Sequence, residues 1–217
     1  LRHLPGVERE RLEEHLRRHA DVSERIGPHP NIAANLTAAW SGDHWWVIDR
    51  WEEGQTLVDR LVDGAFSEYE LKFIMTGIAI GLLALHAEEI IRRELSPKFV
   101  LLRERDDRPI LTDFELAKLQ EGKPTVSPDE WPADPYRAPE VTGDTPVDIR
   151  SDVYSWGRIF VHAACGELPE QGQEPAYLAK VNLPESVAQF VGACVRVPRS
   201  KRPESMAAVL DVLKEWR

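Results

Sequence analysis

The stretch Leu85–Leu102, LHAEEIIRRELSPKFVLL, decides the fold of this 217-residue chain. On its N-terminal side an apolar helix is expected, which Ser67 can cap with a capping-box glutamate three residues on, and which runs to about Glu88. On its C-terminal side two short strands are predicted, Phe99–Leu102 and Pro109–Leu111. The charged centre of the stretch therefore lies between a core helix and a small sheet.

The upstream part contains the other strand-like runs. Residues 7–26 form a charged pattern typical of a surface helix, and Gly27-Pro28 ends it. Ile32–Trp40 and Trp45–Trp51 predict two strands, and the turn residues between them indicate an antiparallel hairpin. Thr56–Val62 predicts a short helix.

The downstream part is mainly helical. Lys118–Arg137 is polar and contains prolines, which indicates a long loop. Arg150–Cys165 predicts a strongly apolar helix, and Glu185–Val197 and Glu204–Trp216 predict two closing helices. A small β-containing start followed by a helical body places the chain in the α+β class.

Further motifs surround the opening stretch in a fixed order. They are HPNI at 29–32, LTDFELAK at 111–118, YRAPE at 136–140, SDVYSWG at 151–157 and KRPE at 201–204. Each is weak alone, but together, in this order and at these spacings, they resemble the motifs of protein kinases of the eukaryotic-like serine/threonine type. In that family the opening stretch is the catalytic loop.

The resemblance implies a protein-kinase-like bilobal fold. Residues 1–51 are expected to form a partial small lobe, with the regulatory helix and the last two strands, and residues 52–217 the large lobe. The family's glycine-rich loop does not precede the regulatory helix, and the first lysine of the chain is Lys72, inside a large-lobe helix. Two explanations stay open: the missing strands lie upstream of Leu1, or the small lobe is naturally reduced.

Several catalytic positions differ from the family's pattern. Glu94 stands where the family has the aspartate that accepts the substrate's proton, so its carboxylate is one methylene longer. Ser96 replaces the lysine that steadies the transferred phosphoryl group. Phe99 replaces the asparagine that holds the second magnesium, and a phenyl ring cannot bind a cation that requires oxygen ligands.

The positions that bind nucleotide are partly retained. Asp113 matches the family's metal-binding aspartate, so the resemblance implies that ATP and magnesium are possible ligands. The register of the hinge puts Asp49 at the gatekeeper position. Arg50 and Glu52 would then offer backbone groups to adenine, and Leu101 would lie beneath it.

The structural positions match the family. Glu140 and Arg202 correspond to its buried ion pair, and Asp152 to the aspartate that caps the catalytic-loop backbone. Arg93 corresponds to the arginine that gathers the activation segment of regulated kinases. In that segment, two hydroxyl residues are possible regulatory phosphorylation sites, Thr125 and Ser127.

A matched framework with an altered catalytic loop indicates a pseudokinase or a very weak kinase that acts as a regulatory, ATP-sensing or scaffolding module. One alternative is an active, atypical serine/threonine kinase that uses Glu94 as base and one metal ion on Asp113. Another is a kinase-fold enzyme that phosphorylates a small molecule. The expected partners are other domains of the same polypeptide and a protein substrate or regulated protein.

The composition of the chain argues against several other classes of protein, among them disordered, nucleic-acid-binding and membrane proteins. Apolar residues make up 42% and charged residues 29% of the chain, which is typical of a globular protein. The net charge of −10 argues against nucleic acid as a partner. No apolar run reaches the roughly 18 residues of a membrane span, and no signal peptide is visible. Cys165 and Cys194 lie in apolar stretches and indicate reduced thiols in the cytoplasm. Arginine far outnumbers lysine, which suggests a bacterial source.

Overall fold

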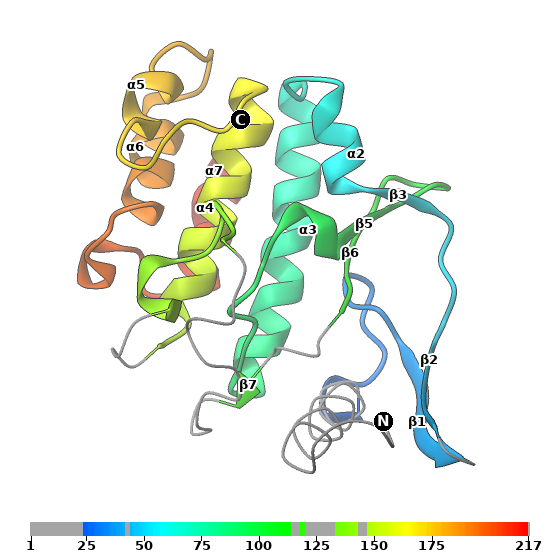
Figure 1. Ribbon diagram of the computed structural model, residues 1–217. Coiled ribbons are helices and arrows are strands. Elements are labelled where there is room, and N and C mark those ends of the chain that lie inside the picture. Colours follow the sequence, from blue (N-terminus) through cyan, green and yellow to red (C-terminus); the bar gives the residue numbers. More distant parts are fainter. Residues whose placement is uncertain (1–23, 42–43, 114–117, 120–132, 143–146, 217) are drawn as a thin grey trace.

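The computed structural model describes residues 24–41, 44–113, 118–119, 133–142 and 147–216. A helical body forms most of this structure, and a two-stranded hairpin stands beside its lower end (Figure 1). The helices are α2 (Leu57–Val62), α3 (Glu68–Ala87), α4 (Arg150–Cys165), α5 (Glu174–Leu178), α6 (Glu185–Cys194) and α7 (Met206–Glu215), with 3-10 turns at Pro97–Phe99, Pro139–Thr142 and Arg199–Lys201.

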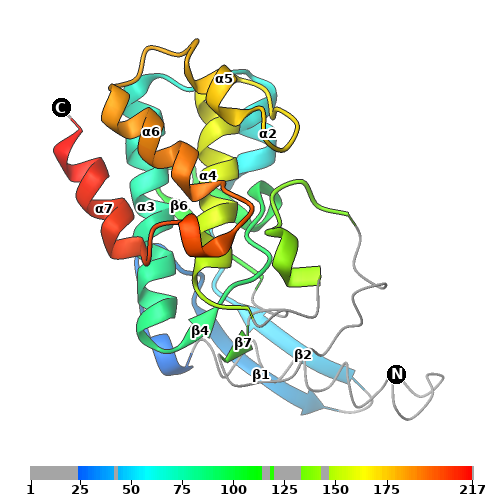
Figure 2. The ribbon, with the colours of Figure 1, turned by 90° about the vertical axis from the view of Figure 1, so that its left-hand side faces the viewer.

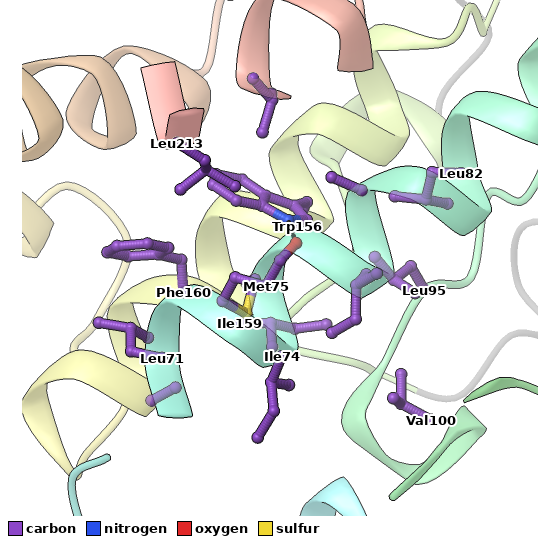
Figure 3. Close-up of a cluster of buried hydrophobic side chains, with 14 of the residues drawn as sticks. Leu71, Ile74, Met75, Leu82, Leu95, Val100, Trp156, Ile159, Phe160 and Leu213 are labelled. Atoms are coloured by element: carbon purple, nitrogen blue, oxygen red, sulfur yellow. Dashed lines mark hydrogen bonds between the residues drawn. The ribbon is translucent and has the colours of Figure 1, made fainter. Parts of the chain in front are cut away.

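The centre of the body is the contact between α3 and α4. α7 packs against α3, and α5 and α6 pack against α4 (Figure 2). Trp156 of α4 is 1% exposed, and its indole Nε1 donates a hydrogen bond of 3.0 Å to the backbone carbonyl of Met75 in α3. Figure 3 shows Trp156 beside Met75 and Leu213 within the apolar cluster. A large indole with its one polar atom satisfied thus joins the two helices.

Local sequence signals explain where these helices begin and end. The Ser67 hydroxyl accepts from the Glu70 N–H, and the Glu70 carboxylate accepts from the Ser67 N–H at 2.9 Å, which confirms the predicted capping box of α3. Hydrogen bonds from Ser67 and then Arg60 lower the pKa of Glu70 to about 2. α4 ends at Gly166, which has the left-handed φ of 75° that glycine adopts without strain.

Three small sheets accompany the helices. β1 (Asn35–Ser41) and β2 (His44–Asp49) form the hairpin. β5 (Val100–Arg103) lies between β3 (Gly54–Thr56) and β6 (Pro109–Leu111), and all neighbours are antiparallel. Gly54 is required in β3 because a Cβ there would lie 2.0 Å from the carbonyl oxygen of Leu102. The third sheet pairs β4 (Ile90–Ile91) with β7 (Lys118–Leu119).

Most expected elements are present, with corrections at their boundaries. The first hairpin strand begins at Asn35, because Ile32 instead forms an isolated bridge to Leu111. The expected long loop from Lys118 starts with the short strand β7, which two residues could not signal in the sequence. Of the expected helix over residues 7–26, residues 24–26 are helical and the earlier ones lie outside the described part.

Among the described residues, α3 is the one helix with the length and apolar composition to cross a membrane. Half of it is buried within the protein. A core helix passes the same test, so this composition is weak evidence for a span.

A glycine in α4 gives a test of the packing between α4 and α6. A Cβ at Gly157 would lie 2.8 Å from Cys194 Cβ and 2.9 Å from Val195 Cγ1. We expect Gly157→Ala to lower the free energy of unfolding, measured in urea, by about 1–3 kcal/mol through overpacking. Gly192→Ala in α6 is the control, because a Cβ there meets no atom within 4 Å. It should raise stability by up to about 1 kcal/mol through helix propensity. Equal effects of the two substitutions would contradict this packing.

Candidate active site

Asp152 fixes the backbone of the loop Arg92–Phe99. Its carboxylate lies in the first turn of α4 without solvent exposure, and it accepts hydrogen bonds of 2.8 Å from the backbone N–H groups of Arg92 and Arg93. Nε2 of His86, near the end of α3, donates to the same carboxylate at 2.8 Å. Three donors satisfy this buried charge and tie α3, the loop and α4 together. These contacts have the form that the resemblance implies for Asp152.

The loop contains a strained turn at Arg93. This residue has a φ of 64°, in the left-handed region, and the Glu94 N–H donates to the Arg92 carbonyl across it at 2.8 Å. A non-glycine residue in such a conformation costs about 1–3 kcal/mol. The hydrogen bonds that the Arg92 and Arg93 amides donate to Asp152 offset that cost, so the turn depends on the buried carboxylate.

Glu94 forms a buried ion pair with Arg137. Arg137 Nη2 donates to Glu94 Oε1, and the side chains are 7% and 9% exposed, respectively. Arg137 belongs to the segment 133–142, which precedes α4 in sequence. Breaking one partner of a buried pair costs about 3–5 kcal/mol, because the other charge stays buried without a counter-charge. The carboxylate at the base position is therefore engaged by a cation.

The segment that carries Arg137 is anchored to α4 by contacts that the sequence did not predict. Arg158 of α4 donates from Nε to the carbonyl of Pro135 at 3.1 Å, and forms an ion pair of 2.6 Å with Glu174. The Tyr136 hydroxyl is hydrogen-bonded to Nδ1 of His162, also in α4, at 2.6 Å. One feature of the sequence could have indicated these contacts. Arg158 lies inside a predicted apolar helix, and a buried arginine needs polar partners.

The two members of the Tyr136–His162 contact stay neutral near pH 7. Burial, reinforced by the charge of Arg158, lowers the pKa of His162. Burial raises the pKa of Tyr136 to about 12. A neutral phenol and a neutral imidazole can form this hydrogen bond with either group as the donor.

Phe99 lies between two cations. Its ring centroid is 5.2 Å from Arg92 Cζ and 4.6 Å from Lys98 Nζ, both within the range of cation–π attraction. Its backbone carbonyl accepts from Thr112 N–H at 2.9 Å, and Arg92 Nη2 donates to the Thr112 carbonyl at 2.8 Å. The position that holds a metal-binding asparagine in kinases is thus an aromatic ring beside positive charge.

Asp113 follows Thr112 directly, so these contacts place it next to the catalytic loop. It has a left-handed φ of 57° and is partly exposed. Among the described residues, no three His, Cys, Asp or Glu side chains form a group that could hold a metal ion. If magnesium binds here, the Asp113 carboxylate would supply one of the oxygen ligands that this ion prefers, and the side chain of Phe99 would supply none.

The expected hinge residues make other contacts within the protein. Asp49, at the end of β2, accepts from Asn35 Nδ2 at 2.7 Å. The Arg50 N–H donates to the Ala34 carbonyl at 2.8 Å, and Glu52 lies 3.8 Å from Arg103 Nη1. Leu101 is partly buried in β5, between Thr56 of β3 and Ile110 of β6. These contacts do not join the four residues in one site.

Glu140 and Arg202 form a bidentate ion pair, with Nη–Oε distances of 2.5 and 2.9 Å. Arg202 also donates to three backbone carbonyls, those of Arg150, Arg196 and Val197, and its guanidinium lies 4.7 Å from the ring centroid of Tyr154. This arginine fastens the 3-10 turn Pro139–Thr142 to the start of α4 and to the segment that follows α6. The expected phosphorylation sites Thr125 and Ser127 lie outside the described residues, as do the loop residues that Arg93 would gather.

The sequence matches the family description "Protein kinase domain" over residues 5–213. The chain belongs to the protein kinase family. It is 29% identical over 207 residues to the serine/threonine-protein kinase pkn2 of Myxococcus xanthus, covering 85% of this chain and 25% of that protein. It is 31% identical over 219 residues to the serine/threonine-protein kinase C of Synechocystis sp., covering 94% of this chain and 41% of that protein.

The kinase domain is α+β and combines the helical large lobe with part of the small lobe, in agreement with the fold expected from the motifs. It also resembles the serine/threonine-protein kinase pak-2 of Caenorhabditis elegans, with 30% identity over 87% of this chain and 36% of that protein. The chain thus spans about a quarter to two fifths of the length of these relatives.

Replacing the buried capping carboxylate tests its structural role. In Asp152→Asn the side chain loses one acceptor oxygen, and its amide group faces backbone donors. We expect the free energy of unfolding in urea to fall by about 2–4 kcal/mol, because buried N–H groups lose their partners. Asp211→Asn, on the exposed side of α7, is the matched control and should change stability by less than about 0.5 kcal/mol. A stable Asp152→Asn protein would contradict the role assigned to this carboxylate.

Proposed function

We propose that this kinase domain is a pseudokinase or a very weak kinase that acts as a regulatory or scaffolding module of a larger protein. The observation that carries the proposal is the buried ion pair between Glu94 and Arg137. A general base must reach the substrate's hydroxyl within hydrogen-bond distance and accept its proton. Here the carboxylate at that position is instead bound to a guanidinium.

The energy of this pair bears directly on the rate. Breaking the ion pair between Glu94 and Arg137 would cost about 3–5 kcal/mol. If the pair must break before the chemical step, this free energy adds to the barrier of phosphoryl transfer. Each 1.36 kcal/mol changes a rate about tenfold, so the penalty corresponds to roughly a hundredfold to a few thousandfold. The longer glutamate side chain adds a positional error to this penalty.

The neighbouring positions support the same proposal. Phosphoryl transfer depends on positioning and charge neutralisation by metal ions and a cationic side chain. Ser96 is 4% exposed and uncharged, and Phe99 carries no oxygen for a metal. The domain therefore lacks two of the groups that stabilise the transferred phosphate.

Nucleotide binding is compatible with this function. Asp113 keeps a carboxylate beside the catalytic loop, where one magnesium ion could neutralise the phosphates of ATP. In this proposal ATP is a regulatory ligand that favours one conformation of the kinase domain, and it is not a substrate. The partners would be other domains of the same polypeptide or a regulated protein, in the cytoplasm. Free thiols at Cys165 and Cys194 agree with a reducing compartment.

A second candidate function is that of an active, atypical serine/threonine kinase. One observation favours it: the turn at Arg93 and its cap by Asp152 are intact, so the framework that positions a catalytic carboxylate is present. In this alternative Glu94 leaves Arg137 when substrate binds and accepts the hydroxyl proton.

Phosphate transfer by the full-length protein distinguishes the two functions. Labelled ATP, magnesium and a generic protein substrate are supplied to the wild type, Glu94→Gln and Asp113→Asn. We expect the rate of phosphate transfer by the wild type to lie within about tenfold of the rate of each variant, because Glu94 is paired with Arg137 and does not act as a base. A thermal shift with ATP and magnesium that Asp113→Asn removes would identify nucleotide binding without turnover. Robust transfer that Glu94→Gln abolishes would contradict the pseudokinase proposal and support the second candidate.

A further inference from the structure

Helix α3 (Glu68–Ala87) has a second apolar face in addition to the one that packs in the core. Tyr69, Phe73 and Ile80 on this face are 78%, 38% and 37% exposed. The rings of Tyr69 and Phe73 lie nearly parallel, with centroids 6.2 Å apart. A helix that is apolar on both faces is normally buried on both, and exposed aromatic side chains are typical of binding surfaces.

This face forms one wall of a groove of about 570 Å³, which we call the α3 groove. Its apolar lining comes mainly from α3 and from the start of β6 and includes Tyr69, Phe73, Ile80 and Pro109. The volume is in the range of sites that enclose a small molecule or a few side chains of a peptide.

The base of the α3 groove is rigid. Asn31 donates from Nδ2 to the carbonyl of Pro109 at 2.8 Å, and its own carbonyl accepts from Leu111 N–H at 2.9 Å. Pro109 packs so closely on α3 that a Cβ at Gly77 would lie 2.4 Å from its Cγ. A preformed groove saves a partner the cost of ordering the surface on binding.

The charges at the α3 groove have one sign. Lys72 and Arg108 line it, and no acidic residue belongs to its described lining. Lys72 donates to the backbone carbonyl of Trp216, and among the described residues it forms no ion pair. Arg108 lies 3.7 Å from Asp106, but that carboxylate already accepts two hydrogen bonds from Arg103. The groove is therefore locally positive in a chain with a net charge of −10.

We propose that the α3 groove binds a peptide segment of a partner protein that presents apolar side chains next to acidic residues. The apolar side chains would contact Tyr69, Phe73 and Ile80, and the carboxylates would lie near Lys72 and Arg108. The inference rests on the proposed scaffolding function, since it names the surface through which a module without catalysis would act. A second copy of this chain is a poorer occupant, because two domains of charge −10 repel each other.

Selection from a displayed library of random peptides tests the proposal. The full-length protein is the bait, and enriched peptides are synthesised and their affinities measured by fluorescence anisotropy. We expect a consensus of apolar residues with adjacent aspartate or glutamate. Phe73→Ser should weaken binding of these peptides about tenfold or more, as should Arg108→Glu.

Two further variants separate a binding effect from misfolding. Tyr69→Ser removes a ring that is largely exposed, so it should weaken binding while the melting temperature stays unchanged. Val62→Ser, at an 82% exposed valine of α2 outside the described lining, is the matched control and should bind like the wild type.

Three results would overturn the proposal: no enriched peptide, a consensus without acidic residues, or affinities that Phe73→Ser and Tyr69→Ser leave unchanged. Sedimentation of the wild type as a dimer that Ile80→Ser dissociates would identify a second copy as the occupant and would also overturn it. Robust phosphate transfer would contradict the pseudokinase proposal but not the proposal of peptide binding in the α3 groove, because the peptide measurements do not depend on turnover.

Discussion

The buried carboxylate of Asp152 is the constraint on which the rest of the site depends. It is placed by α4, the helix that also carries Trp156 at the centre of the core, and it holds two successive amides of the catalytic loop and His86 of α3. A charge without solvent exposure is stable in a protein when its hydrogen-bonding capacity is filled, and three donors do so here. The strained turn at Arg93, and through it the position of Glu94, follow from this one interaction.

The same framework gives the catalytic-loop carboxylate a structural role. The segment that carries Arg137 is fastened to α4 on both sides of this residue. Arg158 of α4 holds the carbonyl of Pro135, and Arg202 pairs with Glu140 while it donates to the carbonyl of Arg150 at the start of α4. The ring of Phe99 also has a structural role, because it attracts the side chains of Arg92 and Lys98. A general base needs a carboxylate that is free to reach the substrate's hydroxyl, whereas the carboxylate of Glu94 is buried and paired with Arg137.

The sequence predicted the parts of the structure that depend on local patterns. The capping box at Ser67, the central helix Arg150–Cys165 and the pair of Glu140 with Arg202 could be found from spacing and from resemblance. The pairs Glu94–Arg137 and Arg158–Glu174 could not, because their partners meet through folding and no periodicity connects them. The two-residue strands β4 and β7 are too short for a pattern. The hinge assignment of Asp49 and Glu52 stays a prediction, as do the phosphorylation sites Thr125 and Ser127.

The central claim is that the Glu94 carboxylate serves the fold through Arg137, and a double-mutant cycle tests it most directly. The free energy of unfolding in urea is measured for the wild type, Glu94→Gln, Arg137→Met and the double variant. We expect the double variant to be more stable than the sum of the single effects implies, with a coupling of about 2 kcal/mol or more, because removing both charges leaves neither buried alone. Effects that add within about 0.5 kcal/mol would show that the two groups act independently, and would contradict the account.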